Sequence, residues 1–310
     1  MNKINLLVSE SDLNSFCSTW FSASIRDHFN LIYHEHNHVH SAADTVCVTN
    51  FLNTDATWYR PYLDRGYKLI VDHFWDSNIT EVSTVTDRLT IRNKNWLWYN
   101  ESLWYRHLGY HNYIPNKQYK HAFLMLMHLK RNHRDQILHA LKNELDSALY
   151  SYVAEGITLD NDLSYAHGDW QRYFNPTWYD TTEFSVVVES MTSSPTWVSE
   201  KTFKPIAYQH PFIIWGSAGT LQYLKEQGFE TFDHVINESY DNCTVPYKRL
   251  HHVVDIIKIL TEKFNNGIRS FDDSVTKEKL KHNHQRFFDQ TLVQQRINDE
   301  IVRELLDFIE

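Results

Sequence analysis

Short apolar runs rich in β-branched residues, separated by longer polar segments, limit what this chain can fold into more than any other feature. In the first third of the chain these runs are Ile4 to Val8, Asn30 to Tyr33, Thr45 to Thr49 and Tyr67 to Val71. Runs of this length are typical of strands buried on both faces of a parallel sheet. Between the first two, Ser11 to Phe29 has the N-cap residue and apolar spacing of a helix. We therefore predict a doubly wound α/β unit.

The same alternation starts again after residue 119. Strands are expected at Ala122 to Met127, Leu149 to Val153, Phe184 to Val188 and Pro211 to Trp215. Helices are expected at Arg134 to Leu145, Ser199 to Tyr208 and Ser217 to Gln227, and over the C-terminal stretch. The stretch from Ser77 to Tyr119 is rich in Trp and Tyr and is expected to be less regular, with a turn at Pro115. We predict two Rossmann-like domains, residues 1–118 and 119–310, whose ligand-binding edges face a common cleft.

Net charge, cysteine content and the length of the apolar runs exclude several classes of protein. The chain has 310 residues, with 30 Lys and Arg against 39 Asp and Glu, a net charge of −9. A negative field repels polyanions, so non-specific nucleic-acid binding is disfavoured, although a local basic cleft is compatible with it. Three widely spaced cysteines form neither a disulfide framework nor a metal motif. No run of 18 apolar residues and no signal peptide is visible, which predicts a cytoplasmic protein without a membrane span.

The segment after the predicted strand Phe184 to Val188 has the pattern of an anion site. Ser199 is a natural N-cap, and free N–H groups at a helix N-terminus attract anions. Lys201 and Lys204 add positive charge to the same helix. We infer a phosphate-bearing ligand. The alternative for Glu200 and Lys201 is an ordinary surface ion pair in a first helical turn.

Three motifs in this region resemble a known family. They are Glu189-Ser190, Trp197-Val-Ser-Glu200-Lys201 and Ile213-Ile-Trp-Gly216-Ser217. Together they resemble the C-terminal donor-binding signature of the α-1,3-fucosyltransferases in order and spacing, with Trp in place of the usual Tyr. The resemblance extends from Phe184 to Ser217.

That resemblance implies a two-domain GT-B fold and a nucleotide-sugar donor such as GDP-fucose. It implies that Glu200 binds ribose or sugar hydroxyls, that Lys201 binds the diphosphate and that Trp197 lies beside the nucleotide. Ser199 belongs to the same donor-binding set. Glu189 is either a ligand of sugar or nucleotide or only the first polar residue of a loop, and Trp197 is equally well explained as a packing aromatic.

A second basic group, His128 to Arg134, follows a predicted strand and opens a predicted helix. Positive charge at a helix N-terminus opposes the macrodipole by about 0.3–1 kcal/mol per charge, which hints at function. Fucosyltransferase-like enzymes also hold the diphosphate with an arginine placed before the Glu-Lys motif. Arg134 is our first choice for that role and Arg131 the second. The alternative is a solvated helix start.

The catalytic base is expected among carboxylates of the first domain, because an inverting transfer needs a group that removes the acceptor's hydroxyl proton. The candidates are Asp72, Asp76, Glu35 and Glu101, of which one is expected to act. Loop solvation is the alternative for each. The four histidines from His34 to His40 alternate as metal ligands could, but no Cys or carboxylate spacing completes a site. We predict a polar loop there and no metal.

These patterns predict a metal-independent, inverting glycosyltransferase without a cofactor, which moves a sugar from a nucleotide diphosphate sugar to a glycan or other hydroxyl acceptor. One alternative is a DNA-base (hydroxymethyl-pyrimidine) glycosyltransferase, with a nucleic-acid acceptor that the net charge disfavours. The other is a non-catalytic nucleotide- or glycan-binding module. Two acidic segments, Phe229 to Asp233 and Asn237 to Asp241, either approach the sugar hydroxyls or serve solubility.

Overall fold

The structure is a computed structural model that describes residues 4–8, 29–33, 45–50, 64–73, 88–92, 98–159, 175–193, 196–303 and 306–307. The chain divides into two compact units. The first unit comprises Met1–Glu101 with Gln290–Glu310, and the second comprises Ser102–Asp289. Each is built around its own parallel sheet.

The first unit contains a five-stranded sheet in the order β2-β1-β3-β4-β5, with every neighbouring pair parallel. The strands are β1 (Ile4–Val8), β2 (Phe29–Tyr33), β3 (Thr45–Asn50), β4 (Lys68–His73) and β5 (Arg88–Arg92). The order is that of a doubly wound sheet whose direction of winding reverses between β1 and β3. The first four strands are those that the apolar runs predict, whereas the helix expected at Ser11 to Phe29 falls largely outside the described residues.

The second unit contains a four-stranded parallel sheet in the order β7-β6-β8-β9. Its strands are β6 (His121–Met127), β7 (Ala148–Tyr152), β8 (Thr182–Val188) and β9 (Phe212–Trp215). All seven residues of β8 are buried, as expected for a central strand covered on both faces. All four predicted strands are confirmed, with ends that differ by one or two residues.

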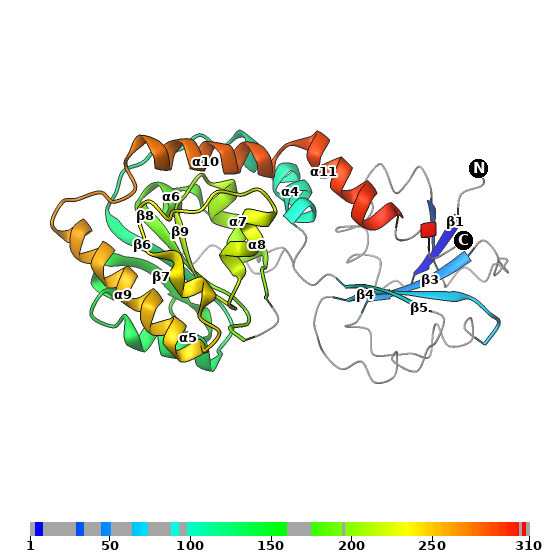
Figure 1. Cartoon of the computed structure of the whole chain (residues 1–310), viewed down its shortest axis with the longest axis horizontal. Helices are drawn as coiled ribbons and strands as arrows, with labels where there is room; N and C mark the ends of the chain where they lie inside the picture. Colours follow the sequence, from blue (N-terminus) through cyan, green and yellow to red (C-terminus); the bar gives the residue numbers. More distant parts are fainter. Residues whose placement is uncertain are drawn as a thin grey trace. The chain divides into compact units, whose positions relative to one another are not determined.

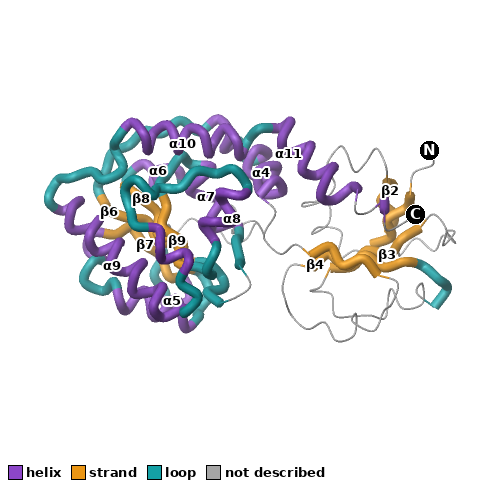
Figure 2. The backbone as a smooth tube through the Cα atoms, in the orientation of Figure 1, coloured by secondary structure: helices purple, strands orange, loops and turns teal. Residues whose placement is uncertain are grey.

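Helices cover both faces of this second sheet. They are α5 (Asn132–Ala140), α6 (Pro176–Asp180), α7 (Glu200–Ala207), α8 (Thr220–Glu226), α9 (Pro246–Asn265) and α10 (Ser274–Phe287). Helix α9 packs on β6 and β9, and α5 lies beside it; α7 packs on β8 and β9, with α10 against its outer side (Figure 1). Figure 2 shows the strands of this unit enclosed by helices. The arrangement is the doubly wound α/β layering predicted for the C-terminal half.

Among its described residues, the stretch that was expected to be irregular contains a strand and an α-helix, followed by a short 3-10 helix (Tyr110–Asn112). The strand is β5, and the α-helix is α4 (Trp98–His107), whose side chains Trp98, Tyr99 and Tyr105 are buried. The expectation of irregular structure was therefore wrong at these positions. Aromatic residues have weak helix propensity, and burial of their large rings stabilises the helix where propensity does not.

The C-terminal segment continues as α11 (Gln290–Ile297) and a π-helical turn (Asn298–Val302). Backbone contacts place this segment with the first unit, and they divide the two units inside α4, between Glu101 and Ser102. These bounds differ from the predicted ranges 1–118 and 119–310. The loop around Pro115 belongs to the second unit, where the side chain of Asp180 accepts a hydrogen bond from the Asn116 N–H at 2.9 Å. The acceptor and donor roles of the two domains stay predictions.

None of the described helices is both long and apolar enough to cross a membrane.

Candidate functional site

The site lies where the strand order of the second sheet reverses, between β6 and β8. Open α/β sheets bind ligands at the carboxyl ends of the strands at such a point. The loops that follow the two strands are joined there. Arg131 Nη1 donates to the Ser190 carbonyl at 3.0 Å, and His133 Nε2 donates to the Glu189 carbonyl at 2.9 Å. The basic group His128 to Arg134 and the motif Glu189-Ser190 are thus brought together.

Glu189 organises this edge of the sheet. Its carboxylate is fully buried and accepts four hydrogen bonds. The donors are Ser199 N at 2.9 Å, Ser199 Oγ at 2.5 Å, Thr202 Oγ1 at 2.7 Å and Ser190 N at 3.2 Å. Gly216 lets the carboxylate fit, since a Cβ at that position would lie 3.3 Å from Glu189 Cγ. These contacts favour a role for Glu189 in holding the start of α7, while direct contact with a ligand stays a prediction.

The first turn of α7 carries the Glu200-Lys201 pair. Ser199 caps the helix, and Lys201 Nζ lies 2.6 Å from Glu200 Oε1, 3.2 Å from Ser190 Oγ and 3.3 Å from Ser199 Oγ. The side chains of Glu200 and Lys201 are only 6% and 21% exposed. The pair is therefore not a solvated surface ion pair. The Tyr105 hydroxyl donates to the Glu200 carbonyl at 3.1 Å and anchors this turn to α4.

Arg134 is the most unusual residue of the site. It lies in the first turn of α5 and is only 2% exposed, which rules out the solvated helix start. Its Nη1 donates to the Leu129 carbonyl at 2.8 Å, and its Nε is buried without a hydrogen-bond partner. No carboxylate of the described chain forms an ion pair with it. Burial, followed by the neighbouring Arg131, lowers the pKa of the guanidinium, while the nearby carboxylates of Glu200 and Glu189 act in the opposite direction.

Further positive charge surrounds the end of β6. Burial lowers the pKa of His128, and so do the nearby charges of Arg134, Lys201 and Lys204. Three cations therefore gather around one imidazole. A cavity of about 30 Å³ lies beneath α7, and Lys201 and Lys204 contribute to its lining. That volume suits a water molecule, so a larger anion would bind over this edge and not inside the cavity.

Trp197 is 3% exposed. Its burial favours packing, and contact with a nucleotide stays a prediction. Two residues that the sequence reasoning missed are Thr202, which holds Glu189, and His133, whose carbonyl accepts from Trp215 Nε1 at 3.4 Å. Thr202 stands three residues after the N-cap Ser199, and its hydroxyl donates to Glu189, which is 13 residues away, so no local spacing signalled this contact. His133 carried no signal beyond its place in the basic loop.

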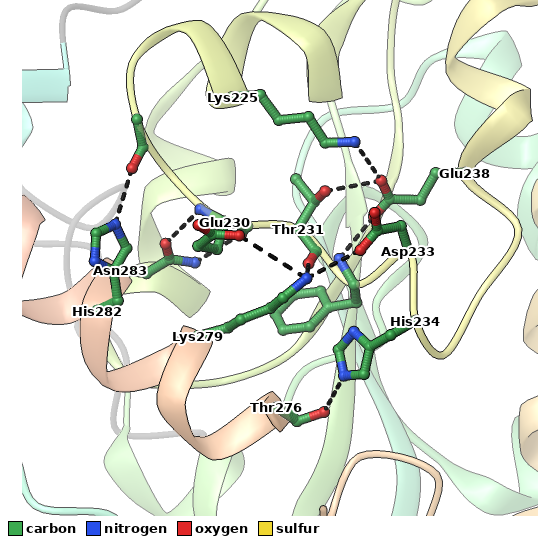
Figure 3. Close-up of polar contacts among 12 residues, drawn as sticks. Lys225, Glu230, Thr231, Asp233, His234, Glu238, Thr276, Lys279, His282 and Asn283 are labelled. Atoms are coloured by element: carbon green, nitrogen blue, oxygen red, sulfur yellow. Dashed lines mark hydrogen bonds and ion pairs between the residues drawn. The ribbon is translucent and has the colours of Figure 1, made fainter. Parts of the chain in front are cut away.

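The acidic segments from Phe229 to Asp241 are occupied by contacts within the chain (Figure 3). Glu238 accepts from Phe232 N at 2.7 Å, from Thr231 Oγ1 at 2.8 Å and from Lys225 Nζ at 2.9 Å. Asp241 accepts from the first backbone N–H groups of α8, those of Leu221 and Gln222, both at 3.0 Å. These carboxylates hold the loop to the second unit.

The four base candidates differ in what the structure shows of them. Asp72 is the penultimate residue of β4, at the carboxyl edge of the first sheet. Glu101 lies in α4 and is buried. Asp76 and Glu35 lie outside the described residues, as do His34 to His40. Within the described chain, no group of three or more His, Cys, Asp or Glu is placed to hold a metal.

Comparison with solved structures reveals the overall likeness. A crystal structure of an α1,3-fucosyltransferase matches 96% of this chain and 90% of its own, with a TM-score of 0.50 and 13% sequence identity. The chain has the fold of an α1,3-fucosyltransferase. A second structure, described as α1,3-fucosyltransferase with GDP-fucose, has a TM-score of 0.44 and 12% identity over the same shares of the two chains. No protein-family model and no curated protein matches the sequence.

The likeness confirms the predicted fold class, an α/β chain with two Rossmann-like units of the GT-B type. It also agrees with the family to which the three C-terminal motifs point. At this level of identity the comparison speaks for the fold, and the activity has to be argued from the site.

Proposed function

We propose that this chain is a glycosyltransferase that moves a sugar from a nucleoside diphosphate sugar to a hydroxyl group of an acceptor. By the resemblance of its motifs, GDP-fucose is the first donor to test. The observation that carries the proposal is the buried guanidinium of Arg134, which has an unpartnered Nε at the point where the strand order reverses.

An isolated buried charge is costly unless an opposite charge or a set of hydrogen bonds compensates it. Arg134 Nη1 donates to one backbone carbonyl, that of Leu129. The guanidinium lies among other cations, with Glu200 and Glu189 nearby but in no ion pair with it. A diphosphate would supply negative charge and acceptors for several N–H groups at once, and arginine binds phosphate in a bidentate manner. The site is therefore built for an anion that comes from outside the chain.

The neighbouring groups have complementary roles in this proposal. Arg131 and Lys201 bind the diphosphate together with Arg134, and the N-terminus of α7 behind Ser199 adds its free N–H groups. Glu200 accepts hydrogen bonds from ribose or sugar hydroxyls. Trp197 lies beside the nucleotide, and Glu189 holds the loop and helix on which these groups stand.

The transfer itself is a substitution at the anomeric carbon. The acceptor oxygen forms a bond to that carbon, the bond from the carbon to the diphosphate oxygen breaks, and the diphosphate leaves with the electron pair. The acceptor's proton passes to a carboxylate, one of Asp72, Asp76, Glu35 or Glu101. The acceptor oxygen attacks on the face opposite the diphosphate in a single displacement, so the proposed reaction inverts the anomeric centre. Arg134, Arg131 and Lys201 stabilise the charge that develops on the leaving diphosphate, so the reaction needs no metal in this proposal.

The first test is calorimetric binding of GDP, UDP and ADP and of their sugars to the whole chain, followed by transfer to a panel of glycan and nucleic-acid acceptors. Binding of a nucleoside diphosphate together with transfer supports the proposal. Binding without transfer or donor hydrolysis points to a non-catalytic module. Absence of binding by every nucleotide overturns the proposal.

The second test separates binding from turnover. Asp72→Asn, Asp76→Asn, Glu35→Gln and Glu101→Gln are compared in donor affinity and in transfer rate. One of them is expected to keep its donor affinity and lose about 10²–10⁴-fold in rate, the usual contribution of a general base. Transfer is expected to survive a chelator; loss in EDTA that zinc or manganese restores would contradict the metal-independent mechanism.

A further inference from the structure

A second buried arginine, Arg249, holds together three segments at the edge of the proposed donor site. It lies in the first turn of α9 and is 1% exposed. Its Nε donates to the Gly216 carbonyl at 2.9 Å, its Nη1 donates to the Cys243 carbonyl, and its Nη2 donates to the Thr192 carbonyl. Its guanidinium also lies over the ring of Trp215, with 5.4 Å between Cζ and the ring centroid.

The three carbonyls come from different parts of the chain. Thr192 belongs to the loop that follows β8, Gly216 directly follows β9, and Cys243 directly precedes the segment leading into α9. Only arginine offers a planar set of donors that can reach three acceptors at once. No carboxylate of the described chain forms an ion pair with it. Arg249 therefore holds backbone carbonyls of three segments together, whereas Arg134 has a buried Nε without a partner.

Two of these contacts lead directly to the groups of the proposed site. Gly216 packs against Glu189, and Glu189 N donates to the Trp215 carbonyl at 2.9 Å, so the position of Gly216 affects the carboxylate that holds α7. Thr192 lies two residues after Ser190, whose hydroxyl accepts from Lys201 and whose carbonyl accepts from Arg131. A shift of either carbonyl would therefore move proposed diphosphate-binding groups.

Two hydroxyl groups also hold the loop after β8 in place. Ser217 Oγ donates to the Ser193 carbonyl at 2.8 Å, and Thr196 Oγ1 donates to the Ala218 carbonyl at 2.9 Å. Among the described residues, these two contacts and Arg249 fasten the loop after β8 to the turn after β9, and Arg249 is the charged one of the three. Backbone groups held in this way need no reordering when a ligand binds.

We propose that Arg249 is a positioning residue of the donor site, which holds the loop 189–193 in the geometry that binds the diphosphate. This inference rests on the proposed function in one respect, which is that the ligand is a nucleoside diphosphate. Its structural part, the ordering of the loop by Arg249, can be tested without any ligand.

The experiment compares the parent chain with Arg249→Lys, which keeps the charge but cannot span three carbonyls. The matched control is Arg286→Lys. Arg286 also donates to a carbonyl, that of Gln227 at 2.6 Å, and also lies over a ring, that of Phe229, but it belongs to α10, and these contacts involve neither the loop after β8 nor the turn after β9. Amide hydrogen exchange of residues 185–193 is measured in the free proteins, and GDP affinity is measured by calorimetry.

Arg249→Lys is expected to speed exchange in this loop and to weaken GDP binding by about 10-fold, the scale of a lost supporting contact. Arg286→Lys is expected to change neither the exchange of this loop nor the GDP affinity, even if both variants lose the same amount of stability. Ser217→Ala acts on the same loop without touching a charge and serves as the second variant should Arg249→Lys fail to fold. It is expected to speed exchange of the loop to a smaller extent.

Unchanged exchange in residues 185–193 of a folded Arg249→Lys variant overturns the inference, and so does faster exchange with unchanged GDP affinity. If the parent chain binds no nucleotide while exchange still rises in Arg249→Lys, the proposed function fails and the ordering of the loop by Arg249 stands. The two failures are thereby distinguished.

Discussion

The basic edge formed by the loops after β6 and β8 and the acidic loop of residues 229–241 use charge in opposite ways. In the acidic loop the side chains are matched within the chain: Glu238 has three donors, and Asp233 accepts from Lys279 Nζ at 2.9 Å (Figure 3). At the basic edge, Arg134 is buried with an unpartnered Nε and shares its surroundings with other cations. Both regions were candidate ligand sites in the sequence, and only the basic edge leaves charge for a ligand to neutralise.

This contrast separates charges that stabilise a fold from charges that await a partner. A carboxylate with several donors inside the chain contributes to stability, and its removal leaves buried donors unsatisfied. A buried cation without a counter-ion opposes folding, and its persistence is explained by a function. The two regions should therefore respond to substitution in opposite ways.

The largest effect is expected at Arg134. Arg134→Met keeps the length of the side chain and removes the charge, so GDP affinity should fall by about 10–100-fold, the equivalent of a charge-assisted hydrogen bond of about 1.5–3 kcal/mol. The stability of the free protein should stay equal or rise, since an uncompensated buried charge disappears. Calorimetry and urea denaturation measure the two quantities. A large loss of stability would show that Arg134 is a structural residue and would remove the contrast.

The acidic loop should show the reverse. Glu238→Ala removes the carboxylate that accepts hydrogen bonds from Phe232 N, Thr231 Oγ1 and Lys225 Nζ. The free energy of unfolding should therefore fall by about 2–3 kcal/mol. GDP affinity of the folded fraction should not change. Lys225→Met is the control, because Lys225 is 41% exposed and its ion pair contributes at most about 1 kcal/mol. Weakened GDP binding in Glu238→Ala would place this loop in the donor site.

The sequence predicted these regions unequally for physical reasons. Strands β6, β8 and β9 were predictable, because burial on both faces leaves a continuous apolar run. The rule for doubly wound sheets places the loops after β6 and β8 at one edge, whereas the contacts of Arg131 with Ser190 and of His133 with Glu189 were not predicted. Strand β5 was missed because its sequence, with arginine at both ends, is not a continuous apolar run. The helix α4 was missed because aromatic residues have weak helix propensity, and the burial of Trp98, Tyr99 and Tyr105 depends on tertiary packing.

The role of Arg249 could not be predicted at all. Its partners are backbone carbonyls of Thr192, Gly216 and Cys243, and carbonyls leave no mark in an amino-acid sequence. Arg134 was predicted because its position at a helix N-terminus is locally unfavourable. Arg249 also lies in the first turn of a helix, so the local rule by itself does not separate an arginine that binds a ligand from one that holds backbone carbonyls.

Acid should first affect the histidines packed within the second unit. His210 is fully buried, its Nδ1 accepts from Ser185 Oγ at 2.9 Å, and its Nε2 donates to the Thr182 carbonyl at 2.9 Å. Burial holds the pKa of His210 well below its usual 6.5. The unfolded chain therefore binds the proton more tightly, and the stabilisation present above pH 6.5 is lost as the pH falls below it. Urea midpoints measured from pH 8 to 5 should fall, and the fall should be smaller in His210→Gln.

The smallest effect is expected in the acidic loop, at lower pH. The hydrogen bond from Lys279 lowers the pKa of Asp233 below its usual 3.8, so its contribution is present above pH 3.8 and is lost as the pH falls through the lowered value. Solvent screens this contact, because the Asp233 side chain is 62% exposed. Lys279→Met should therefore make the urea midpoint depend slightly less on pH below pH 4. The fall of the midpoint near pH 6.5 should stay unchanged. A change in the fall near pH 6.5 in Lys279→Met would show instead that the acidic loop is coupled to the buried His210.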